Sequence, residues 1–469
     1  MKSAKFEIPW PSISIFNKNT MNTIPPKKVF ESLNKSILVD GFDMVFDPTK
    51  SKGAKLYDSK NNRTFIDFFS FFASNPIGMN HPRMSEKAFE EKLLKFSKVK
   101  VSNSDVYTTA YAEFVSTFHK HLAPKFDRLF FIEGGALGVE NAIKTAQDWK
   151  VRKNLASGKG EKGTQILHFK EAFHGRTGYT LSLTNTAPEK IQYFPKFDWP
   201  RVTNPKLNFP LTPASIKNTI ALEKKAVAEI EEAFQKRRDE ICAIIIEPIQ
   251  GEGGDNFFRG EFLQKLRELC DQHDALLIFD EVQTGMGLTG KVWAHENYDV
   301  LPDIIAFGKK VQVCGCAVRL EKLNEVDNVF KVPSRINSTW GGNIVDMIRS
   351  TQFIDIMIEE KLLSHVTKLG TQMKRELESI SLKYEEISAV RGLGLWMAFD
   401  LPTTEMRNEF IELCWKNGLI ILSCGSKSIR VRPVLNLKSE EAEEGLAIIQ
   451  KSAEELLKVS KKKVGSKKS

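Results

Sequence analysis

Short, unbroken apolar segments alternate with longer amphipathic segments through the middle of this 469-residue chain. The apolar segments lack a regular polar–apolar alternation, so we expect strands that are buried on both faces of a sheet. The expected strands are 128–132, 165–169, 243–247, 275–279 and 304–307. The segments with apolar side chains at helical spacing are 138–153, 221–236 and 260–273. This order predicts an α/β domain with a mostly parallel central sheet covered by helices.

The pattern changes near residue 343, where a long helical stretch, 344–380, precedes several short strands and a final amphipathic helix. We therefore expect a second, smaller α+β domain. The first 80 residues carry scattered aromatic runs, and we expect them to pack on that smaller domain and on a partner subunit. The predicted divisions are an N-terminal segment at 1–80, a large domain at 81–342, a small domain at 343–459 and a disordered lysine-rich tail at 460–469.

Composition argues against several functional classes. The net charge is +9, but five lysines lie in the last nine residues, which leaves +4 and no reason to expect nucleic-acid binding. No apolar run approaches the roughly 18 residues of a membrane span. The six cysteines form no C-x-x-C pair, so we expect reduced thiols and no metal site. With no secretory signal pattern at the N-terminus, we expect a cytoplasmic protein.

Charged residues stand directly after two of the expected strands. Asp280 follows 275–279, and Lys309 and Lys310 follow 304–307 after one glycine. In a parallel sheet the carboxyl ends of the strands meet at one edge, where ligands bind. A lysine that forms a Schiff base and an acid that partners a pyridine nitrogen are the groups that pyridoxal 5′-phosphate (PLP) requires. Each junction alone could be ordinary, but together they predict a PLP site that only one of the two lysines can reach.

Two further strand exits carry residues suited to such a cofactor. After 128–132, Gly135 and Ala136 open a helix whose backbone N–H groups could bind a phosphate, although a plain tight turn would look the same. After 165–169, Phe173 could stack on a ring and Arg176 could hold a carboxylate. Core packing and a surface ion pair are the alternatives for these two residues.

The remaining candidates lie in loops and on one late strand. Glu252 lies in a glycine-rich loop after 243–247, and Gln283 follows Asp280 closely enough to reach a ring hydroxyl. Arg430 and Arg432 stand two residues apart along one expected strand, and the residues alone leave open which of them pairs with Glu252.

Four spaced motifs, FHGRT, EPIQGEGG, FDEVQTG and PDIIAFGKK, occur in this order. The set resembles the class-III, fold-type-I PLP aminotransferases. Further stretches, among them VDGFDMVFD, DFFSFFAS and VPSRINSTWGGN, are similar to the branch that acts on the ε-amino group of L-lysine. The resemblance covers about 29–434 and implies PLP as cofactor and a homodimer with its active site at the interface.

The resemblance also implies a role for each candidate around the cofactor. Lys309 would form the Schiff base, and Asp280 would hold the pyridine nitrogen. The other implied cofactor contacts are Gln283 at the ring oxygen, Phe173 stacked on the ring, Gly135 and Ala136 at the phosphate, and Thr339 at the phosphate from the partner subunit.

On the substrate side, the resemblance implies that Arg176 holds the far carboxylate, with Asn337 nearby. Glu252 would mask an arginine in one half-reaction and release it in the other. Arg430 is preferred to Arg432 because the family's arginine stands three residues before a proline, here Pro433.

The implied activity is a ping-pong transamination. L-lysine and 2-oxoglutarate would become 2-aminoadipate 6-semialdehyde and L-glutamate. The alternatives are a relative that uses 4-aminobutyrate or ornithine, a PLP mutase or decarboxylase on the same scaffold, and a non-catalytic homologue. That every catalytic position is filled argues against the last alternative.

Overall fold

The computed structural model describes residues 24–465 and is built around a seven-stranded sheet with strand order β4-β10-β9-β8-β7-β5-β6. β10 runs antiparallel to both of its neighbours, and the other adjacent pairs are parallel. The strands are β4 (Arg128–Ile132), β5 (Gln165–Phe169), β6 (Arg201–Val202), β7 (Ile241–Ile246), β8 (Leu276–Asp280), β9 (Ile304–Phe307) and β10 (Cys314–Val318). The predicted mostly parallel sheet is confirmed.

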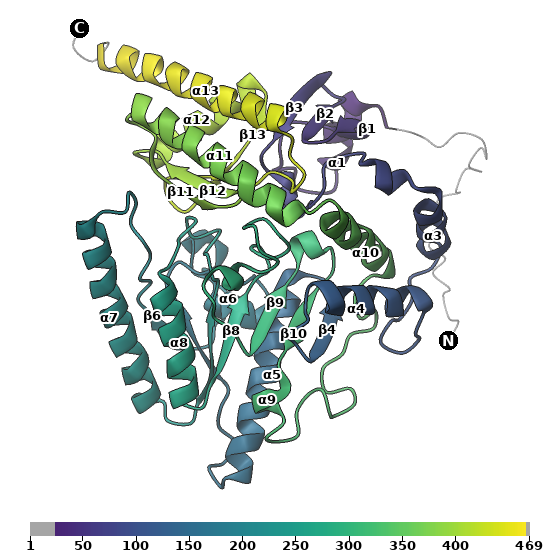
Figure 1. Ribbon diagram of the computed structural model, residues 1–469, viewed down its shortest axis with the longest axis vertical. Helices are drawn as coiled ribbons and strands as arrows, with labels where there is room; N and C mark the ends of the chain where they lie inside the picture. Colours follow the sequence, from purple (N-terminus) through teal and green to yellow (C-terminus); the bar gives the residue numbers. More distant parts are fainter. Residues whose placement is uncertain (1–23, 466–469) are drawn as a thin grey trace, which may run out of the picture.

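The central strands are buried along their whole length because helices cover both faces of the sheet (Figure 1). Along β8, Leu276 and Ile278 share a core cluster with side chains of α5 (Gly135–Ala156). Leu277 and Phe279 point the other way and pack with side chains of α7 (Pro213–Lys236) and α8 (Gly260–Gln272). Apolar residues are thus needed on both faces of each strand, which explains the unbroken apolar runs.

Two strands of this sheet were not predicted from the sequence. β6 has only two residues, and β10 reads CGCAV, with two cysteines and a glycine in place of strong strand formers. β10 fits between β4 and β9 because Gly315 comes so close to β4 that a Cβ on it would lie 1.9 Å from the Phe130 carbonyl oxygen. Tertiary packing determines this strand, and local propensity does not.

The N-terminal segment joins the C-terminal part of the chain in one sheet, with the strand order β1-β2-β3-β13. Figure 1 shows its purple strands beside the yellow-green elements from the other end of the chain. The four strands are β1 (Phe46–Lys52), β2 (Lys55–Asp58), β3 (Arg63–Asp67) and β13 (Leu419–Ile420). A third sheet, of order β11-β12-β15-β14, consists of β11 (Ser388–Leu393), β12 (Trp396–Asp400), β14 (Leu422–Cys424) and β15 (Ser428–Val431).

The long helical stretch expected at 344–380 is two helices, α10 (Ile344–Glu359) and α11 (Leu362–Lys383). Lys361, between them, has a left-handed backbone with φ of 53°. The break reflects two packing partners: α10 packs against α4 (Thr109–His121) of the large domain, whereas α11 packs against β11. No glycine or proline marks the break, so the sequence pattern did not reveal it.

The last helix, α13 (Ser439–Gly465), continues past residue 460, where a disordered tail was predicted. That prediction is wrong for 460–465, since lysine is a good helix former and can extend an established helix. Residues 466–469 lie outside the described residues, as do 1–23.

The remaining α-helices are α1 (Val29–Leu33), α3 (Lys87–Ser97), α6 (Gly178–Leu183), α9 (Leu320–Leu323) and α12 (Thr404–Asn417). The element labelled α2 (Ser70–Ala73) is a single turn with left-handed backbone angles. Within residues 24–465, no helix combines the length and the apolar character that crossing a membrane requires.

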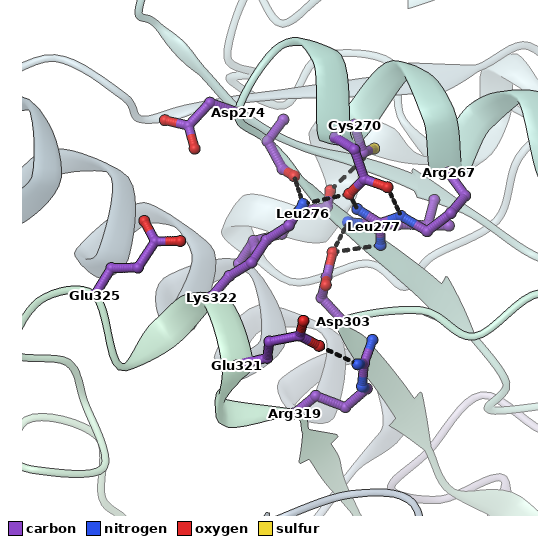
Figure 2. A network of polar contacts seen from close by, with 12 residues as sticks. Arg267, Cys270, Asp274, Leu276, Leu277, Asp303, Arg319, Glu321, Lys322 and Glu325 are labelled. Atoms are coloured by element: carbon purple, nitrogen blue, oxygen red, sulfur yellow. Dashed lines mark hydrogen bonds and ion pairs between the residues drawn. The ribbon is translucent and has the colours of Figure 1, made fainter.

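A polar network ties the sheet to α8 at the amino ends of β8 and β9 (Figure 2). Asp303 accepts hydrogen bonds from the Leu277 N–H at 2.8 Å and from Arg267 Nη1 at 2.6 Å. Arg267 also binds Asp271, which in turn accepts from Lys322 at 2.7 Å. These charges balance one another inside the network, which makes it a structural brace. The other end of the strands is therefore where chemistry should be sought.

Candidate functional site

A cavity of about 330 Å³ opens at the carboxyl ends of the parallel strands. Its walls come from five loops that follow β4, β5, β7, β8 and β9. The lining residues are Gly135, Ala136, Phe173, His174, Gly175, Glu247, Asp280, Val282, Gln283, Lys309 and Cys314. All six residues of the chain's own predicted cofactor set are among them.

The two adjacent lysines have different surroundings. Lys309 lines the cavity and donates to the Phe72 carbonyl oxygen at 3.3 Å. Burial lowers the pKa of Lys309 to about 8, and the nearby positive charge of Arg430 contributes. Lys310 is 1% exposed and donates to the Gln283 carbonyl at 3.1 Å, away from the cavity. Lys309 is thus the lysine positioned to react, and it is uncharged more readily than a surface lysine.

Asp280 is held in one orientation. Its Oδ1 accepts from the Val282 N–H at 3.0 Å, and its Oδ2 lies 2.8 Å from Nδ1 of His174. The His174 side chain is fully buried, and its Nε2 has no partner among the described residues. His174 was not among the predicted site residues, and its contact with Oδ2 orients the Asp280 carboxylate.

Glu247 joins two walls of the cavity. Its Oε1 accepts from the Phe173 N–H at 2.9 Å, and its Oε2 accepts from the Gly251 N–H at 3.1 Å. Burial, together with the neighbouring Asp280, raises the pKa of Glu247 well above its usual range. The residue therefore positions Phe173 and the start of the glycine-rich loop.

The N-terminus of α5 forms another part of the cavity wall. Gly134 has φ of 97°, and Gly135 packs so closely that a Cβ on it would lie 2.9 Å from Cγ1 of Val282. The first N–H groups of a helix have no acceptor within the helix, and the helix dipole favours an anion there. Gly135 and Ala136 can thus bind a phosphate group through their backbone.

These features fit PLP. The cavity has an anion-binding helix end, a fixed carboxylate for a ring nitrogen and a lysine of lowered pKa. Oε1 of Gln283 is buried and has no partner within residues 24–465, and a ring hydroxyl would satisfy it. Phe173 lines the wall where a ring could stack.

Arg430 of β15 and Arg432, which follows that strand, have different acidic partners in the same loop. Nη2 of Arg430 lies 3.1 Å from Oε2 of Glu252. Arg432 instead forms a fully buried ion pair with Asp255 and stacks over Trp396, with 3.4 Å between its guanidinium carbon and the ring centroid. The preference for Arg430 as the partner of Glu252 thus agrees with the geometry.

Glu252 has a second cation that the sequence did not reveal. Nζ of Lys190 lies 2.5 Å from Oε1 of Glu252. Burial alone would raise the pKa of Glu252, but Arg430 and Lys190 together hold it below its usual range. Lys190 ends a short 3-10 helix, Pro188–Lys190, 62 residues before Glu252, so no sequence pattern linked the two.

Arg176 lies at the mouth of the site. It is exposed, and its guanidinium carbon is 5.9 Å from the centroid of the Phe173 ring. Lys190 approaches the same ring to 5.7 Å. Of these two cations Arg176 is the more exposed, and its guanidinium suits the carboxylate of a substrate that enters the site.

A strained turn was also missed. Ser70, Phe71, Phe72 and Ala73 all have left-handed backbone angles, with φ between 39° and 60°. Asp67 accepts from the N–H groups of Phe69 and Ser70 and thereby stabilises the turn. The turn brings the Phe72 carbonyl to Lys309 and places the Phe72 ring 5.8 Å from Arg430. Such strain often marks a functional region.

Five predicted residues do not line the cavity of their own chain: Arg176, Glu252 and Arg430 lie beside it, whereas Thr339 and Asn337 have no contact with these groups among the described residues. Thr339 and Asn337 are exposed and absent from its lining. The Thr339 carbonyl accepts from Ser102 at 2.5 Å, which fixes the loop on the outside of the large domain. The role expected of Thr339 in a partner's site remains a prediction, as does substrate binding by Asn337.

Comparison with known proteins adds to this geometry. The family described as class-III aminotransferases matches residues 39–452. An L-lysine-epsilon aminotransferase of Mycobacterium tuberculosis is 46% identical over 429 residues, which span 91% of this chain and 95% of that protein. One from Streptomyces clavuligerus is 43% identical and spans 90% and 93%, respectively. A solved structure of lysine aminotransferase from M. tuberculosis has a TM-score of 0.90 and 46% identity, covering 92% of this chain and 100% of that one.

Proposed function

Because this chain belongs to the class-III aminotransferase family, whose members depend on PLP, we propose that it transfers the ε-amino group of L-lysine to 2-oxoglutarate. The family membership confirms the predicted fold, cofactor and enzyme class. The choice of lysine is supported by relatives of 43–46% identity that are lysine ε-aminotransferases. The products would be 2-aminoadipate 6-semialdehyde, which can close to a cyclic imine, and L-glutamate.

Bound PLP supplies an aldehyde that takes up the amino group and a ring that withdraws electrons from the carbon losing its proton. Lys309 would be the attachment point, and its freed Nζ would take that proton from the substrate carbon and pass it to the cofactor carbon that carried the aldehyde. Its lowered pKa makes the neutral amine available near neutral pH. Asp280, oriented by His174, would keep the ring nitrogen protonated.

The observation that carries the substrate proposal is the Glu252–Arg430 ion pair beside the cavity. L-lysine would present its ε-amine to the cofactor and its carboxylate to Arg176. Next to the reacting carbon it carries no charge, so Glu252 can stay on Arg430. Glutamate has a carboxylate at its reacting carbon, and that group would take Arg430 after Glu252 moves away. One site would then serve both half-reactions.

The test mixes the PLP-loaded protein with L-lysine, L-ornithine or 4-aminobutyrate and follows conversion to the amine form of the cofactor by its visible spectrum. We expect L-lysine to convert the enzyme fastest, and 2-oxoglutarate to restore the starting spectrum. Faster conversion by either of the other amines would overturn the choice of donor. A colourless protein that binds no PLP would contradict the activity as a whole.

We also propose a cytoplasmic homodimer in which the partner subunit contributes Thr339. The exposed loop around Thr339 and the exposed apolar residues Val106, Tyr107 and Trp340 support a covered surface. The six free cysteines are compatible with a reducing compartment. Sedimentation analysis of the holoenzyme tests the dimer. If Thr339→Ala leaves PLP affinity unchanged, the phosphate role is wrong.

A further inference from the structure

Glu252 uses its two carboxylate oxygens on two different cations. Oε2 lies 3.1 Å from Nη2 of Arg430 on β15, and Oε1 lies 2.5 Å from Nζ of Lys190 at the rim of the large domain. The Glu252 side chain is 26% exposed, and those of Lys190 and Arg430 are 20% and 6% exposed. The carboxylate is therefore shared between a deeply buried partner and a partner at the rim.

The first cation that pairs with a partly buried carboxylate stabilises it more than the second does, because an unpaired charge bears the whole desolvation penalty. Moving Glu252 off Arg430 therefore costs less when Lys190 still holds it than when it has no other partner. Lys190 can keep its contact with a moving Glu252 because its long, flexible side chain extends from a short 3-10 helix, Pro188–Lys190. Arg430, in contrast, is fixed in a buried strand.

We propose that Lys190 is the second cation of the carboxylate switch and holds Glu252 when the carboxylate of glutamate or 2-oxoglutarate takes Arg430. This inference rests on the proposed function, because it presumes that Glu252 leaves Arg430 in one half-reaction. Lys190 is then a positioning residue that favours the dicarboxylate substrates. The lysine half-reaction, in which Glu252 stays on Arg430, does not need it.

The first experiment measures each half-reaction separately in the PLP-loaded Lys190→Met variant, by rapid mixing and visible absorbance. We expect the apparent Kd for L-glutamate to rise about fivefold, while that for L-lysine changes less than twofold. Lys190→Arg should restore the affinity for glutamate, because it restores the charge. Equal losses with both amino acids, or no loss with either, would overturn the proposal.

Lys196→Met is the matched control. Lys196 lies six residues later, in the stretch that follows the 3-10 helix, but it donates to the carbonyls of Ile191 and Phe194 at 2.8 and 2.7 Å and is not bonded to Glu252. It should leave the affinity for glutamate unchanged. If Lys196→Met reproduces the effect of Lys190→Met, the effect comes from disturbing the segment, and the switch role of Lys190 is wrong.

A pH profile separates charge pairing from simple packing. The charged groups around Glu252 are Arg430, Lys190, Lys309 and Glu247. Without Lys190, a Glu252 that has left Arg430 keeps neither of its two ion pairs, so burial favours its protonated form. Glutamate should then bind the Lys190→Met variant more tightly as the pH falls from 8 to 6, in contrast to the parent protein. Identical profiles for the two proteins would contradict the proposal.

Glu252→Ala distinguishes failure of this inference from failure of the proposed function. If Glu252 is the switch, its removal changes the preference between lysine and glutamate, and adding Lys190→Met then has no further effect. An unchanged preference in Glu252→Ala would refute the switch itself. A changed preference in Glu252→Ala combined with no effect of Lys190→Met would refute only the role of Lys190.

Discussion

The buried ion pair between Asp255 and Arg432 should be essential for stability although it lies outside the cavity. Asp255 is fully buried, and Arg432 is 1% exposed. Burial raises the pKa of Asp255 in spite of Arg432, and burial lowers the pKa of Arg432 to about 10. Both pKa shifts disfavour the charged forms, so each ion relies on the charge of the other to offset the cost of its burial.

Asp255→Asn would keep the shape of the side chain and leave the guanidinium buried without a counter-charge. Removal of one partner of a buried pair costs about 3–5 kcal/mol. Arg432 would keep the carbonyls of Met397 and Val431, at 3.1 and 2.9 Å, so the lower end of this range is expected. We therefore expect Asp255→Asn to lose about 3 kcal/mol of unfolding free energy.

Urea unfolding at pH 7, followed by tryptophan fluorescence, measures the loss, since Trp396 stacks on Arg432. Glu232→Gln is the control: its pair with Lys236 is mostly exposed and should be worth less than about 1 kcal/mol. The double variant Asp255→Leu with Arg432→Met should regain part of the loss, because it leaves no buried charge. An unfolding midpoint of Asp255→Asn equal to that of the parent protein would refute this reasoning.

Three further outcomes are expected. Lys309→Met should bind PLP only noncovalently. If the loaded variant is treated with borohydride, denatured in acid and then examined by mass spectrometry, no cofactor should remain on the chain. Because burial lowers the pKa of Lys309 to about 8, the fraction of neutral Lys309 rises from about one-tenth at pH 7 to about nine-tenths at pH 9. PLP should therefore attach to the cofactor-free protein about tenfold faster at pH 9 than at pH 7. Gly253→Ala should raise the KM for 2-oxoglutarate and lower the melting temperature. The added Cβ would lie 2.0 Å from the Glu171 carbonyl oxygen and would displace the loop that carries Glu252. Steady-state kinetics and calorimetry test the two effects, and values equal to those of the parent protein would show that the loop adapts.

The cofactor end of the site could be predicted from the sequence because it depends on topology more than on detail. Wherever buried parallel strands end, the following residues meet at one edge of the sheet. Asp280 and Lys309 each follow such a strand, so their approach required only that the strands be recognised. The choice between Lys309 and Lys310 came from resemblance, and the structure supplies its physical basis in the opposite surroundings of the two side chains.

The substrate end was harder to predict because its contacts link irregular segments that are distant in sequence. Lys190 meets Glu252 across 62 residues, and the Phe72 carbonyl meets Lys309 across 237 residues. The left-handed turn that presents Phe72 contains no glycine, so the sequence does not suggest it. Such contacts depend on how the N-terminal segment and the loops pack, which local patterns do not encode.

The spacing of two acids and two arginines explains how this end of the site can be both firm and mobile. Arg430 lies in β15, whereas Arg432 follows Val431, the last residue of that strand, so Arg430 can pair with Glu252 beside the cavity while Arg432 packs on Trp396. Their partners, Glu252 and Asp255, are three residues apart in a single loop. The Arg432–Asp255 pair is shut off from water and holds the loop against the strand, whereas Glu252 is partly exposed and shared with Lys190. A carboxylate that enters the site therefore has to displace only the side chain of Glu252, because Asp255 keeps the loop in place.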